Sequence, residues 1–583
     1  MDTSPSFDSL SLSNVNSAVG AFVFEVLARL GVEMVVTCPG SRSTPLTFAA
    51  SRNPRLETVS FLDERSAAFF ALGYAKSKRK PVVIVCTSGT AASNFLPAIV
   101  EAQISKVPLI VFTADRPFEL RNCSEGQVID QTKLYGNFVN QFFEIGVPEN
   151  DISYFNYIRQ TLIHVVHRFM GLDSGPCHIN FPFREPLAPE EGQSSVMPAE
   201  ELLKLASVMI KLTEIAKPSL TTDRLLLEKL SSHRKGIIVV GTFEGSASDA
   251  QLIKHLAIIS DKLGWPILAD ALNPVRNHSN SFSHLVTHYD AFLRDGQRSK
   301  DLIPSAILQI GKLPTSKILR SWIQKSGSQR FLFNDTYDNI DPLHGCSIPL
   351  MGDLGAISES LEVYPSDEDW LRRWDQVEML YEDAISRELD SIASSFEGKV
   401  SKLLSTELPE GSAIMIANSM SVRYAESYWV KNNLKNRIFF NRGANGIDGT
   451  LSTALGLAHN GLNTFLLTGD LAFLHDTNGL QFANKLKGSL SIILVNNNGG
   501  GIFEFLPISK FDSFEDYFAT PQTVDYELLA QAFGVQYCKV NGISDLRLRL
   551  KEVANKSIRI IEIVTDRSLD IVTHKDLNKI RQL

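Results

Sequence analysis

A carboxylate and a run of amides each follow an apolar segment in the last third of the chain. Asp470 comes just after the run 464–467, and three asparagines at 496–498 follow the run 490–495. One carboxylate, one amide oxygen and a backbone carbonyl suit a hard divalent cation that keeps water and takes its remaining ligands from a phosphate. The glycines at 499–501 let the backbone approach that phosphate closely. Together these segments predict a site for a phosphate bound through a metal ion.

Each of these segments alone also has an ordinary structural explanation. An Asp after a strand is often a helix cap, and Asn-Gly is common turn chemistry. The combination is more specific, because the carboxyl ends of neighbouring parallel strands meet at one edge of a sheet, where ligands of doubly wound folds bind. We therefore expect residues 464–503 to form a strand, a crossover helix and a second strand of a parallel sheet.

Four polar clusters in the first part of the chain also follow strand-like runs, at 41–44, 63–65, 87–90 and 115–116. Strands that alternate with helical patterns predict an α/β domain whose parallel strands bring these clusters to one rim. Arg42 and Arg116 on one rim indicate anion binding, because a guanidinium group grips a carboxylate with two hydrogen bonds. Glu64 alone is explained equally well by the helix dipole, which favours an acid in a first helical turn.

Length and composition limit the class of protein. A chain of 583 residues is too long for one hydrophobic core, so three or four domains are expected. With 44% hydrophobic and 21% charged residues it has an ordinary globular composition, and no apolar run approaches the roughly 18 residues of a membrane span. The net charge of -8 argues against nucleic acid or an acidic membrane as the main partner. Six cysteines without a CxxC pair or metal-ligand spacing indicate a reducing compartment.

Strand and helix patterns divide the chain into successive segments. The start lacks the cationic and apolar parts of a secretory signal and the arginines of a transit peptide, so it suggests a disordered, processed or added tail, with delivery to an organelle left open. Residues 186–200 are rich in Pro, Glu and Ser, which indicates a linker. Apolar residues at helical spacing among charges indicate an amphipathic helix in 366–396. We predict a tail at 1–12, a first α/β domain at 13–190, a central α/β domain at 196–365, a connecting helix at 366–396 and a last α/β domain at 397–583.

The central and last domains add a few residues that could do chemistry. The central domain contains no GxGxxG and no P-loop, and Lys317 is its only candidate. In the last domain, two strand-turn-helix patterns place Ser419 and Arg423 on one turn and Arg442 on another. The chain has no adjacent pair of histidines, no nucleophile elbow and no zinc-binding helix.

Several longer motifs carry a family resemblance. They are PGSRSTPL at 39–46, DERSAAFFALGYAK at 63–76, TSGTAASN at 87–94, TADRP at 113–117 and NRGANGIDG at 441–449. Gly469-Asp470 with Asn496-Asn497 also resembles the diphosphate-magnesium motif of thiamine diphosphate enzymes, with Leu471 where glycine is usual. Over nearly its whole length the chain resembles the 2-succinyl-5-enolpyruvyl-6-hydroxy-3-cyclohexene-1-carboxylate synthase family of menaquinone and phylloquinone biosynthesis. This resemblance implies three doubly wound, mainly parallel-sheet α/β domains.

The resemblance also implies a reaction. Members of this family are transferases that decarboxylate 2-oxoglutarate with thiamine diphosphate and Mg²⁺ or Mn²⁺, and then add the succinyl-semialdehyde carbanion to isochorismate. The products are 2-succinyl-5-enolpyruvyl-6-hydroxy-3-cyclohexene-1-carboxylate and carbon dioxide. The absence of a histidine pair agrees with this ligation, because a nearby acid could protonate the carbanion and release an aldehyde. Both substrates are multiply anionic, which gives the rim arginines a purpose.

Carried over residue by residue, the resemblance implies a role for each candidate. Glu64 activates the cofactor through its aminopyrimidine ring, and Ile447 holds the cofactor bent. The implied catalytic residues are Glu64, Arg42, Gln127 and Arg423. The implied cofactor-binding residues are Glu64, Ile447, Gly469, Asp470, Leu471, Asn497, Gly499, Ile502 and Phe503, of which Asp470, Asn497 and Gly499 hold the metal. The implied substrate-binding residues are Ser419, Arg423, Arg442, Ile502 and Phe503 for 2-oxoglutarate, and Ser41, Arg42, Arg116, Gln127 and Lys317 for isochorismate.

The positions of two key residues bear on assembly. Glu64 belongs to the first predicted domain and Asp470 to the last, so neither domain alone completes a site. In this superfamily the two halves usually come from different subunits, which implies a homodimer or homotetramer. The resemblance further implies small anionic substrates as partners, with no nucleic acid and no membrane. It implies the cytoplasm in a bacterium, or the plastid stroma in a plant or alga.

Other functions fit parts of the sequence. Another thiamine diphosphate 2-oxoacid decarboxylase or carboligase is the nearest alternative, and an acetohydroxyacid synthase would usually carry flavin. A catalytically inactive cofactor-binding assembly domain is a second alternative, which the presence of Glu64, Asp470 and Asn497 opposes. A magnesium-nucleotide phosphotransferase would need the P-loop that the chain lacks.

Overall fold

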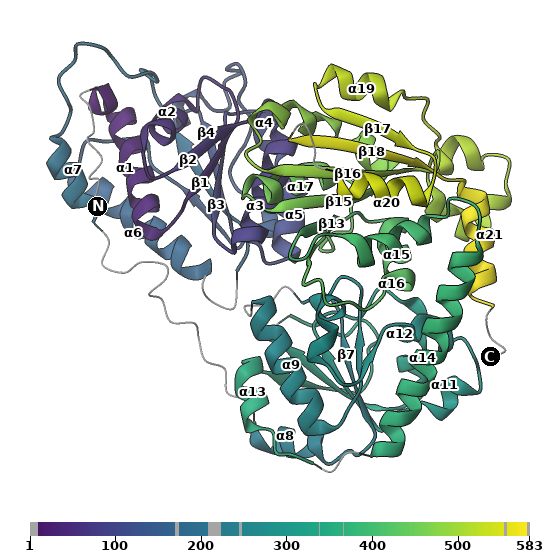
Figure 1. Ribbon diagram of the computed structural model, residues 1–583. Coiled ribbons are helices and arrows are strands. Elements are labelled where there is room, and N and C mark those ends of the chain that lie inside the picture. Colours follow the sequence, from purple (N-terminus) through teal and green to yellow (C-terminus); the bar gives the residue numbers. More distant parts are fainter. Residues whose placement is uncertain are drawn as a thin grey trace. The chain divides into compact units, whose positions relative to one another are not determined.

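The computed structural model of the protein describes residues 10–169, 174–207, 223–243, 248–336, 338–364, 367–552 and 557–579. These residues form three six-stranded sheets of parallel strands, in α/β domains as predicted (Figure 1). The chain also divides into two compact units. The first unit comprises Met1–Pro218, Asn441–Gly461 and His475–Gly488, and the second comprises Ser219–Phe440, Leu462–Leu474 and Ser489–Leu583.

The first unit contains a sheet in the order β2-β1-β3-β4-β6-β5. Its strands are β1 (Met34–Thr37), β2 (Glu57–Ser60), β3 (Val82–Cys86), β4 (Leu109–Asp115), β5 (Gln141–Glu144) and β6 (Cys177–Pro182). The four central strands are wholly buried, which is why they read as continuous apolar runs in the sequence. The accompanying helices are α1 (Val15–Leu30), α2 (Thr44–Arg52), α3 (Glu64–Lys78), α4 (Thr90–Asn94), α5 (Leu96–Ile104) and α6 (Ile152–Phe169).

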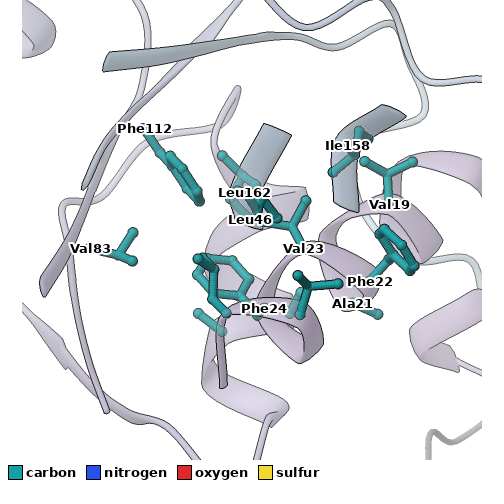
Figure 2. Close-up of a cluster of buried hydrophobic side chains, with 14 of the residues drawn as sticks. Val19, Ala21, Phe22, Val23, Phe24, Leu46, Val83, Phe112, Ile158 and Leu162 are labelled. Carbon is teal, nitrogen blue, oxygen red and sulfur yellow. The ribbon is translucent and has the colours of Figure 1, made fainter. Parts of the chain in front are cut away.

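The core of this unit is built around α1, which is buried almost all round. Figure 2 shows side chains of α1 next to those of the sheet and of α6. The Phe24 ring centroid lies 6.0 Å from that of Phe112 on β4, and the Phe22 ring centroid lies 5.0 Å from that of Phe155 on α6. A helix that is apolar on every side is stable only when neighbours cover all of it, and here they do.

The same core extends beyond both boundaries expected for the first domain. Leu12, in the 3-10 helix η1 (Leu10–Leu12), is buried in it, so residues 10–12 do not belong to a disordered tail. Residues 1–9 of the expected tail lie outside the described residues. The helix α7 (Ala199–Leu205) contributes a buried leucine to this core, although the central domain was expected from residue 196. At both ends, apolar side chains find partners that the polar composition around them did not indicate.

The second unit contains the other two sheets. One has the order β12-β11-β10-β7-β8-β9, with β7 (Gly236–Val240), β8 (Ile267–Ala269), β9 (Leu285–Val286), β10 (Ala306–Ile310), β11 (Gln329–Asn334) and β12 (Ser347–Met351). Its helices are α8 (Arg224–Ser231), α9 (Asp249–Leu263), η5 (Pro274–Ser281), α10 (Tyr289–Phe292), α11 (Arg298–Asp301), α12 (Lys317–Ser326) and α13 (Leu354–Ser360). The long helix α14 (Glu368–Ser391) occupies the stretch predicted to be an amphipathic helix, and it buries Trp370, Trp374 and Tyr381.

The remaining sheet has the order β14-β13-β15-β16-β18-β17. Its strands are β13 (Ala413–Ile416), β14 (Arg437–Phe439), β15 (Asn463–Gly469), β16 (Ser489–Asn496), β17 (Gln536–Val540) and β18 (Ile558–Val564). The strands predicted within 464–467 and 490–495 are confirmed as the parallel neighbours β15 and β16. The predicted crossover helix is instead two short elements, α18 (Asp470–His475) and the 3-10 helix η6 (Thr477–Lys485). The other helices after residue 396 are α15 (Glu397–Glu407), α16 (Met420–Tyr428), α17 (Thr450–His459), η7 (Gly501–Phe505), η8 (Pro507–Lys510), η9 (Glu515–Ala519), α19 (Tyr526–Ala532), α20 (Ile543–Lys551) and α21 (Arg567–Leu577). Of these, α17 belongs to the first unit.

Within the described ranges, no helix combines the length and the apolar character that crossing a membrane requires.

Candidate active site

The carboxyl ends of β15 and β16 bring Asp470 to the loop that follows β16. β15 ends at Gly469 and pairs there with Val495 of β16, so Asp470 starts α18 beside this loop. The Asp470 carboxylate accepts a hydrogen bond from the Gly499 N–H at 2.8 Å, and another from the Leu471 N–H at 2.8 Å. The sheet register therefore places the carboxylate against the loop that carries Asn497 and Gly499.

Asn497 presents an oxygen that needs a partner. Its side chain is only 8% exposed, and its Oδ1 atom is buried without a hydrogen-bond partner among the described residues. A buried acceptor left in this state costs about 1–3 kcal/mol. Asp470, which is 3% exposed, has a pKa raised by burial, and a bound cation would reverse that shift. An amide oxygen on this loop and a buried carboxylate that is hydrogen-bonded to the loop fit a hard divalent cation.

The loop after β16 is held in a conformation that requires glycine. Gly499 has φ +129°, and a Cβ there would clash with the carbonyl oxygen of Ala519. Arg567, the first residue of α21, donates to the Asn498 carbonyl, and its Nε lies 3.1 Å from Glu504. Arg567 was not among the residues predicted from the sequence. It follows the end of β18, so the rule that polar residues gather after parallel strands could have found it.

The helix α16 carries two further candidates. Ser419 is its N-cap with φ +66°, and Arg423 donates through Nη1 to the Ser419 carbonyl. Both residues are half-buried. Ile502, on η7, packs against a core cluster that includes Met420 of this helix. Phe503 is half-buried on the same short helix, whereas Lys317 is exposed at the start of α12.

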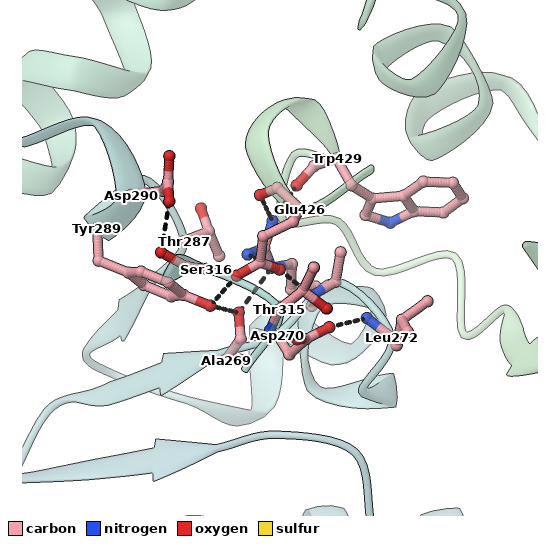
Figure 3. A network of polar contacts seen from close by, with 12 residues as sticks. Ala269, Asp270, Leu272, Thr287, Tyr289, Asp290, Thr315, Ser316, Glu426 and Trp429 are labelled. Atoms are coloured by element: carbon pink, nitrogen blue, oxygen red, sulfur yellow. Dashed lines mark hydrogen bonds and ion pairs between the residues drawn. The ribbon is translucent and has the colours of Figure 1, made fainter. Parts of the chain in front are cut away.

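A buried polar network fixes α16 in the second unit (Figure 3). The Glu426 carboxylate, on α16, accepts from the Ala271 N–H at 2.8 Å and from Arg276 Nη2 at 3.2 Å, and it also bonds the Tyr289 hydroxyl. Asp270 extends the network, because its carboxylate accepts a hydrogen bond from the Thr315 N–H at 2.6 Å. Because α12 starts two residues after Thr315, the network ties the start of α12 and the helix that carries Arg423 to the end of β8.

In the first unit, two arginines and a glutamine meet at the carboxyl ends of β1, β3 and β4. Arg42 donates through Nη1 to the Phe183 carbonyl at 2.8 Å. Arg116 donates through Nη1 to the Gln127 carbonyl at 3.0 Å and also bonds the Ser88 hydroxyl. Gln127 in turn donates to the Ser88 carbonyl at 2.9 Å. The structure therefore brings Arg42, Arg116 and Gln127 to one rim, and Ser41 is exposed next to Arg42.

The electrostatics of this rim favour an anion. The Nε atoms of Arg42 and Arg116 are buried and have no hydrogen-bond partner in the described part of the chain. Burial, followed by the charge of Arg116, lowers the pKa of Arg42. The Glu185 carboxylate lies 3.4 Å from Arg42 Nη1, and the two unused Nε–H groups on this rim can still donate to a further anion.

A buried glutamine holds the turn beside this rim. Gln131 accepts from the Gly89 N–H at 3.0 Å, and it donates to the Ala114 carbonyl at 3.2 Å and to Asn180 Oδ1 at 2.9 Å. Gln131 was not predicted from the sequence, because all these partners lie on other strands and turns and leave no local signal around it.

Glu64 is the first residue of α3 and is half-buried. The residues on either side of it are fixed. Asp63 accepts from the Ser66 N–H at 2.9 Å and from the Asn478 amide at 2.7 Å, and Arg65 donates to the His475 carbonyl at 2.6 Å. This bonding sets the direction of the helix start, and with it the position of the Glu64 backbone.

The neighbouring Asp476 gives a pH-dependent prediction for stability. Its buried carboxylate accepts from the Ser452 N–H at 2.6 Å and the Ser452 hydroxyl at 2.9 Å, and burial raises its pKa to about 6. Because the folded pKa lies above the unfolded one, this group's contribution to stability is present at low pH and is lost as the pH rises through 6. Relative to Asp476→Asn, the wild type should lose about 2 kcal/mol of unfolding free energy between pH 4.5 and 7.5.

Calorimetric unfolding of both proteins across this pH range measures the difference. Asn cannot ionise, so the free energy of unfolding of the wild type should fall steadily relative to that of Asp476→Asn as the pH rises. Parallel curves would show that Asp476 does not titrate in this window.

The predicted site residues divide between the two units. The first unit contains Ser41, Arg42, Glu64, Arg116, Gln127, Arg442 and Ile447, and the second contains Lys317, Ser419, Arg423, Gly469, Asp470, Leu471, Asn497, Gly499, Ile502 and Phe503. Arg442 and Ile447 are both half-buried on the turn between β14 and α17.

Three domain families match the chain in order. Residues 17–134 match "Thiamine pyrophosphate enzyme, N-terminal TPP binding domain", residues 216–416 match "Middle domain of thiamine pyrophosphate", and residues 419–563 match "Thiamine pyrophosphate enzyme, C-terminal TPP binding domain". Each family corresponds to one of the three sheets.

Full-length relatives carry one shared name. The chain is 44% identical over 570 residues to a 2-succinyl-5-enolpyruvyl-6-hydroxy-3-cyclohexene-1-carboxylate synthase of Trichodesmium erythraeum. The aligned residues cover 96% of this chain and 97% of the relative. Synthases of the same name from Gloeothece citriformis and a Nostoc species are 44% and 43% identical. They cover 96% and 97% of this chain, and 97% and 98% of their own lengths.

Proposed function

Because the chain belongs to the 2-succinyl-5-enolpyruvyl-6-hydroxy-3-cyclohexene-1-carboxylate synthase family, we propose how its own residues carry out that family's reaction. The protein is a thiamine diphosphate-dependent transferase that joins 2-oxoglutarate to isochorismate and releases carbon dioxide, in menaquinone or phylloquinone biosynthesis. The observation that carries the proposal is the buried Oδ1 of Asn497, which finds no hydrogen-bond partner among the described residues, on the loop that is hydrogen-bonded to Asp470. A different thiamine diphosphate decarboxylase is not favoured, because the relatives that cover nearly the whole chain share one activity.

The cofactor is held from two sides in this proposal. When bound, thiamine diphosphate supplies a thiazolium carbon that attacks a 2-oxoacid and stabilises the charge left by loss of carbon dioxide. Asp470, Asn497 and the Gly499 carbonyl would hold Mg²⁺ or Mn²⁺, which would in turn bind the diphosphate, and Gly469 and Leu471 would line the same site. Glu64 would hydrogen-bond the aminopyrimidine ring and so promote loss of the thiazolium proton, and Ile447 would pack against the cofactor and set its conformation.

Ion pairs hold the two substrates. Ser419, Arg423 and Arg442 bind the carboxylates of 2-oxoglutarate, and Ile502 and Phe503 form apolar walls that exclude water. Arg42, Arg116 and Gln127 bind isochorismate and orient it for addition, together with Ser41 and Lys317. The Nε–H groups of Arg42 and Arg116 support this assignment, because neither has a hydrogen-bond partner among the described residues, so each can donate to a substrate carboxylate in addition to the contact of Arg42 with Glu185 at 3.4 Å.

Replacing Arg116 by Gln tests the isochorismate side. A hydrogen bond to a charged group contributes about 1.5–3 kcal/mol, so KM for isochorismate should rise roughly 10- to 100-fold. KM for 2-oxoglutarate should stay within about twofold, because Arg423 and Arg442 bind that substrate. Steady-state kinetics with each substrate varied in turn gives both values.

Arg184→Gln is the matched control for this measurement. Arg184 also lies after a strand of the first sheet, but it is half exposed and paired with Glu119. The same loss of charge there should leave both KM values near those of the wild type. Equal effects of the two substitutions would point to general electrostatic attraction rather than to a contact with isochorismate.

Labelled carbon dioxide provides a test of the reaction class. 2-Oxoglutarate labelled at its 1-carboxyl group should release label only with thiamine diphosphate and a divalent ion, and continued release should require isochorismate. Label released equally well without the cofactor would contradict the proposed function.

We further propose that the active protein is a homodimer or homotetramer, found in the cytoplasm of a bacterium or in the plastid stroma of a plant or alga. The division of Glu64 and Asp470 between two units supports a site completed by a second subunit. Native mass spectrometry combined with an activity assay tests the assembly, and a fully active monomer would contradict it.

A further inference from the structure

We propose that Glu101 is a positioning residue that fixes the turn between β14 and α17, the turn on which Arg442 and Ile447 lie. This inference rests on the proposed roles of those two residues. Glu101 itself touches neither substrate nor cofactor in this proposal. It acts through the backbone of the turn.

The Glu101 carboxylate grips two successive backbone N–H groups. Glu101 lies on α5 and its side chain is 3% exposed. Oε1 accepts from the Gly443 N–H at 2.9 Å, and Oε2 accepts from the Ala444 N–H at 2.7 Å. Both partners belong to the first unit. Because each oxygen bonds a different peptide unit, the turn cannot rotate without breaking a charge-assisted hydrogen bond in a buried place.

The contact is also sterically close. A Cβ on Gly443 would lie 2.8 Å from the Ser105 hydroxyl oxygen and 2.9 Å from Oε2 of Glu101. The turn therefore packs directly onto α5, with no room for a side chain between them. Arg442 directly precedes the gripped residues and Ile447 follows them closely, so a displaced turn moves both.

Two other groups, neither of which belongs to the turn, also lie close to the same carboxylate. The Ser105 hydroxyl donates to Oε1 at 2.7 Å, and the Lys76 ammonium lies 3.6 Å from Oε1. Lys76 is 8% exposed and balances the buried charge, at a distance longer than a hydrogen bond. If Glu101 served only the stability of the fold, its ion pair with Lys76 would be the important contact. In our proposal the important contacts are the hydrogen bonds from the two N–H groups of the turn. Variants of the two residues separate these accounts.

Hydrogen exchange of the protein without cofactor is the first readout. In Glu101→Gln the amide NH2 group faces one of the two N–H groups, donor against donor, so one hydrogen bond is lost. Exchange at residues 443–444, followed by mass spectrometry, should be at least tenfold faster than in the wild type. In Lys76→Met, which keeps the carboxylate on the turn, exchange at these amides should stay within threefold.

Kinetics provide the second readout. Glu101→Gln should raise KM for 2-oxoglutarate and the Kd for thiamine diphosphate about tenfold, because Arg442 and Ile447 are displaced, and leave KM for isochorismate within about twofold. Lys76→Met should leave all three values near those of the wild type in the folded fraction. If Glu101→Gln does not fold, Glu101→Asp retains the charge but cannot reach both N–H groups, and it should show the same changes.

The outcomes are decisive for this proposal alone. Unchanged exchange and unchanged KM for 2-oxoglutarate in both Glu101 variants would overturn it, and so would equal effects of Lys76→Met and Glu101→Gln. A wild-type protein that does not consume 2-oxoglutarate with isochorismate would instead refute the proposed function. The exchange measurement needs no activity, so it still tests the grip on the turn in that case.

Discussion

Glu64→Gln should bind thiamine diphosphate with nearly unchanged affinity and lose most of its turnover. Positioned acid-base groups contribute about 100- to 10,000-fold to rates, so kcat should fall at least 100-fold. The amide is almost the same size as the carboxylate, but it carries no charge to favour the reactive tautomer of the aminopyrimidine ring. Because the bonds of Asp63 and Arg65 fix the helix start, the substitution should change the charge without moving the backbone.

Two measurements check this result. Steady-state kinetics gives kcat, and proton exchange at the thiazolium carbon, followed by NMR, isolates the activation step. Glu33→Gln, at an exposed carboxylate paired with Lys80 in the same unit, is the control for loss of one negative charge. If Glu64→Gln keeps a normal rate and normal exchange, Glu64 is not the activating residue.

Asp470→Ala should abolish the metal-dependent part of cofactor binding. Residues that only support metal ligands already contribute 10- to 100-fold to affinity, so losing a ligand should weaken thiamine diphosphate binding about 100-fold or more in Mg²⁺. Asn497→Ala should have an effect of the same kind, because its buried Oδ1 is the second protein side-chain ligand in our proposal. Removing the metal from the wild type with a chelator should reproduce both results.

The neighbouring asparagine offers a matched control. Asn496, the last residue of β16, donates to the Glu562 carboxylate on β18 at 2.7 Å and is not a proposed ligand. Thiamine diphosphate is titrated calorimetrically into Asp470→Ala, Asn497→Ala and Asn496→Ala, with and without Mg²⁺. The affinity for thiamine diphosphate in Mg²⁺ should fall strongly in the first two variants and only slightly in Asn496→Ala. Unchanged affinity in Asp470→Ala would count against a metal site here.

The parts of the fold that were predictable are those set by local pattern. Strands buried on both faces of a parallel sheet read as short continuous apolar runs, and β15 and β16 lie where these runs predicted them. The meeting of Asp470 with the 496–499 loop follows from the same rule, since the carboxyl ends of neighbouring parallel strands share an edge.

Contacts between distant segments were not predictable from one sequence. Glu101 had no local signal, because its partners Gly443 and Ala444 are more than 340 residues away. Leu12 was assigned to a tail because the start of the chain lacks the features of a secretory signal and of a transit peptide, yet it is buried in the first core. Periodicity shows which face of a segment is apolar, and the segment that covers this face is decided by the packing of the whole unit.

Mass spectrometry of the products formed from 2-oxoglutarate and isochorismate shows whether the protein joins the two substrates. With thiamine diphosphate and Mg²⁺, the wild type should give one new product whose mass equals the sum of both substrates minus carbon dioxide. Without the cofactor, or with Glu64→Gln, this product should be nearly absent. Formation of succinic semialdehyde alone, or of the joined product without thiamine diphosphate, would contradict the account.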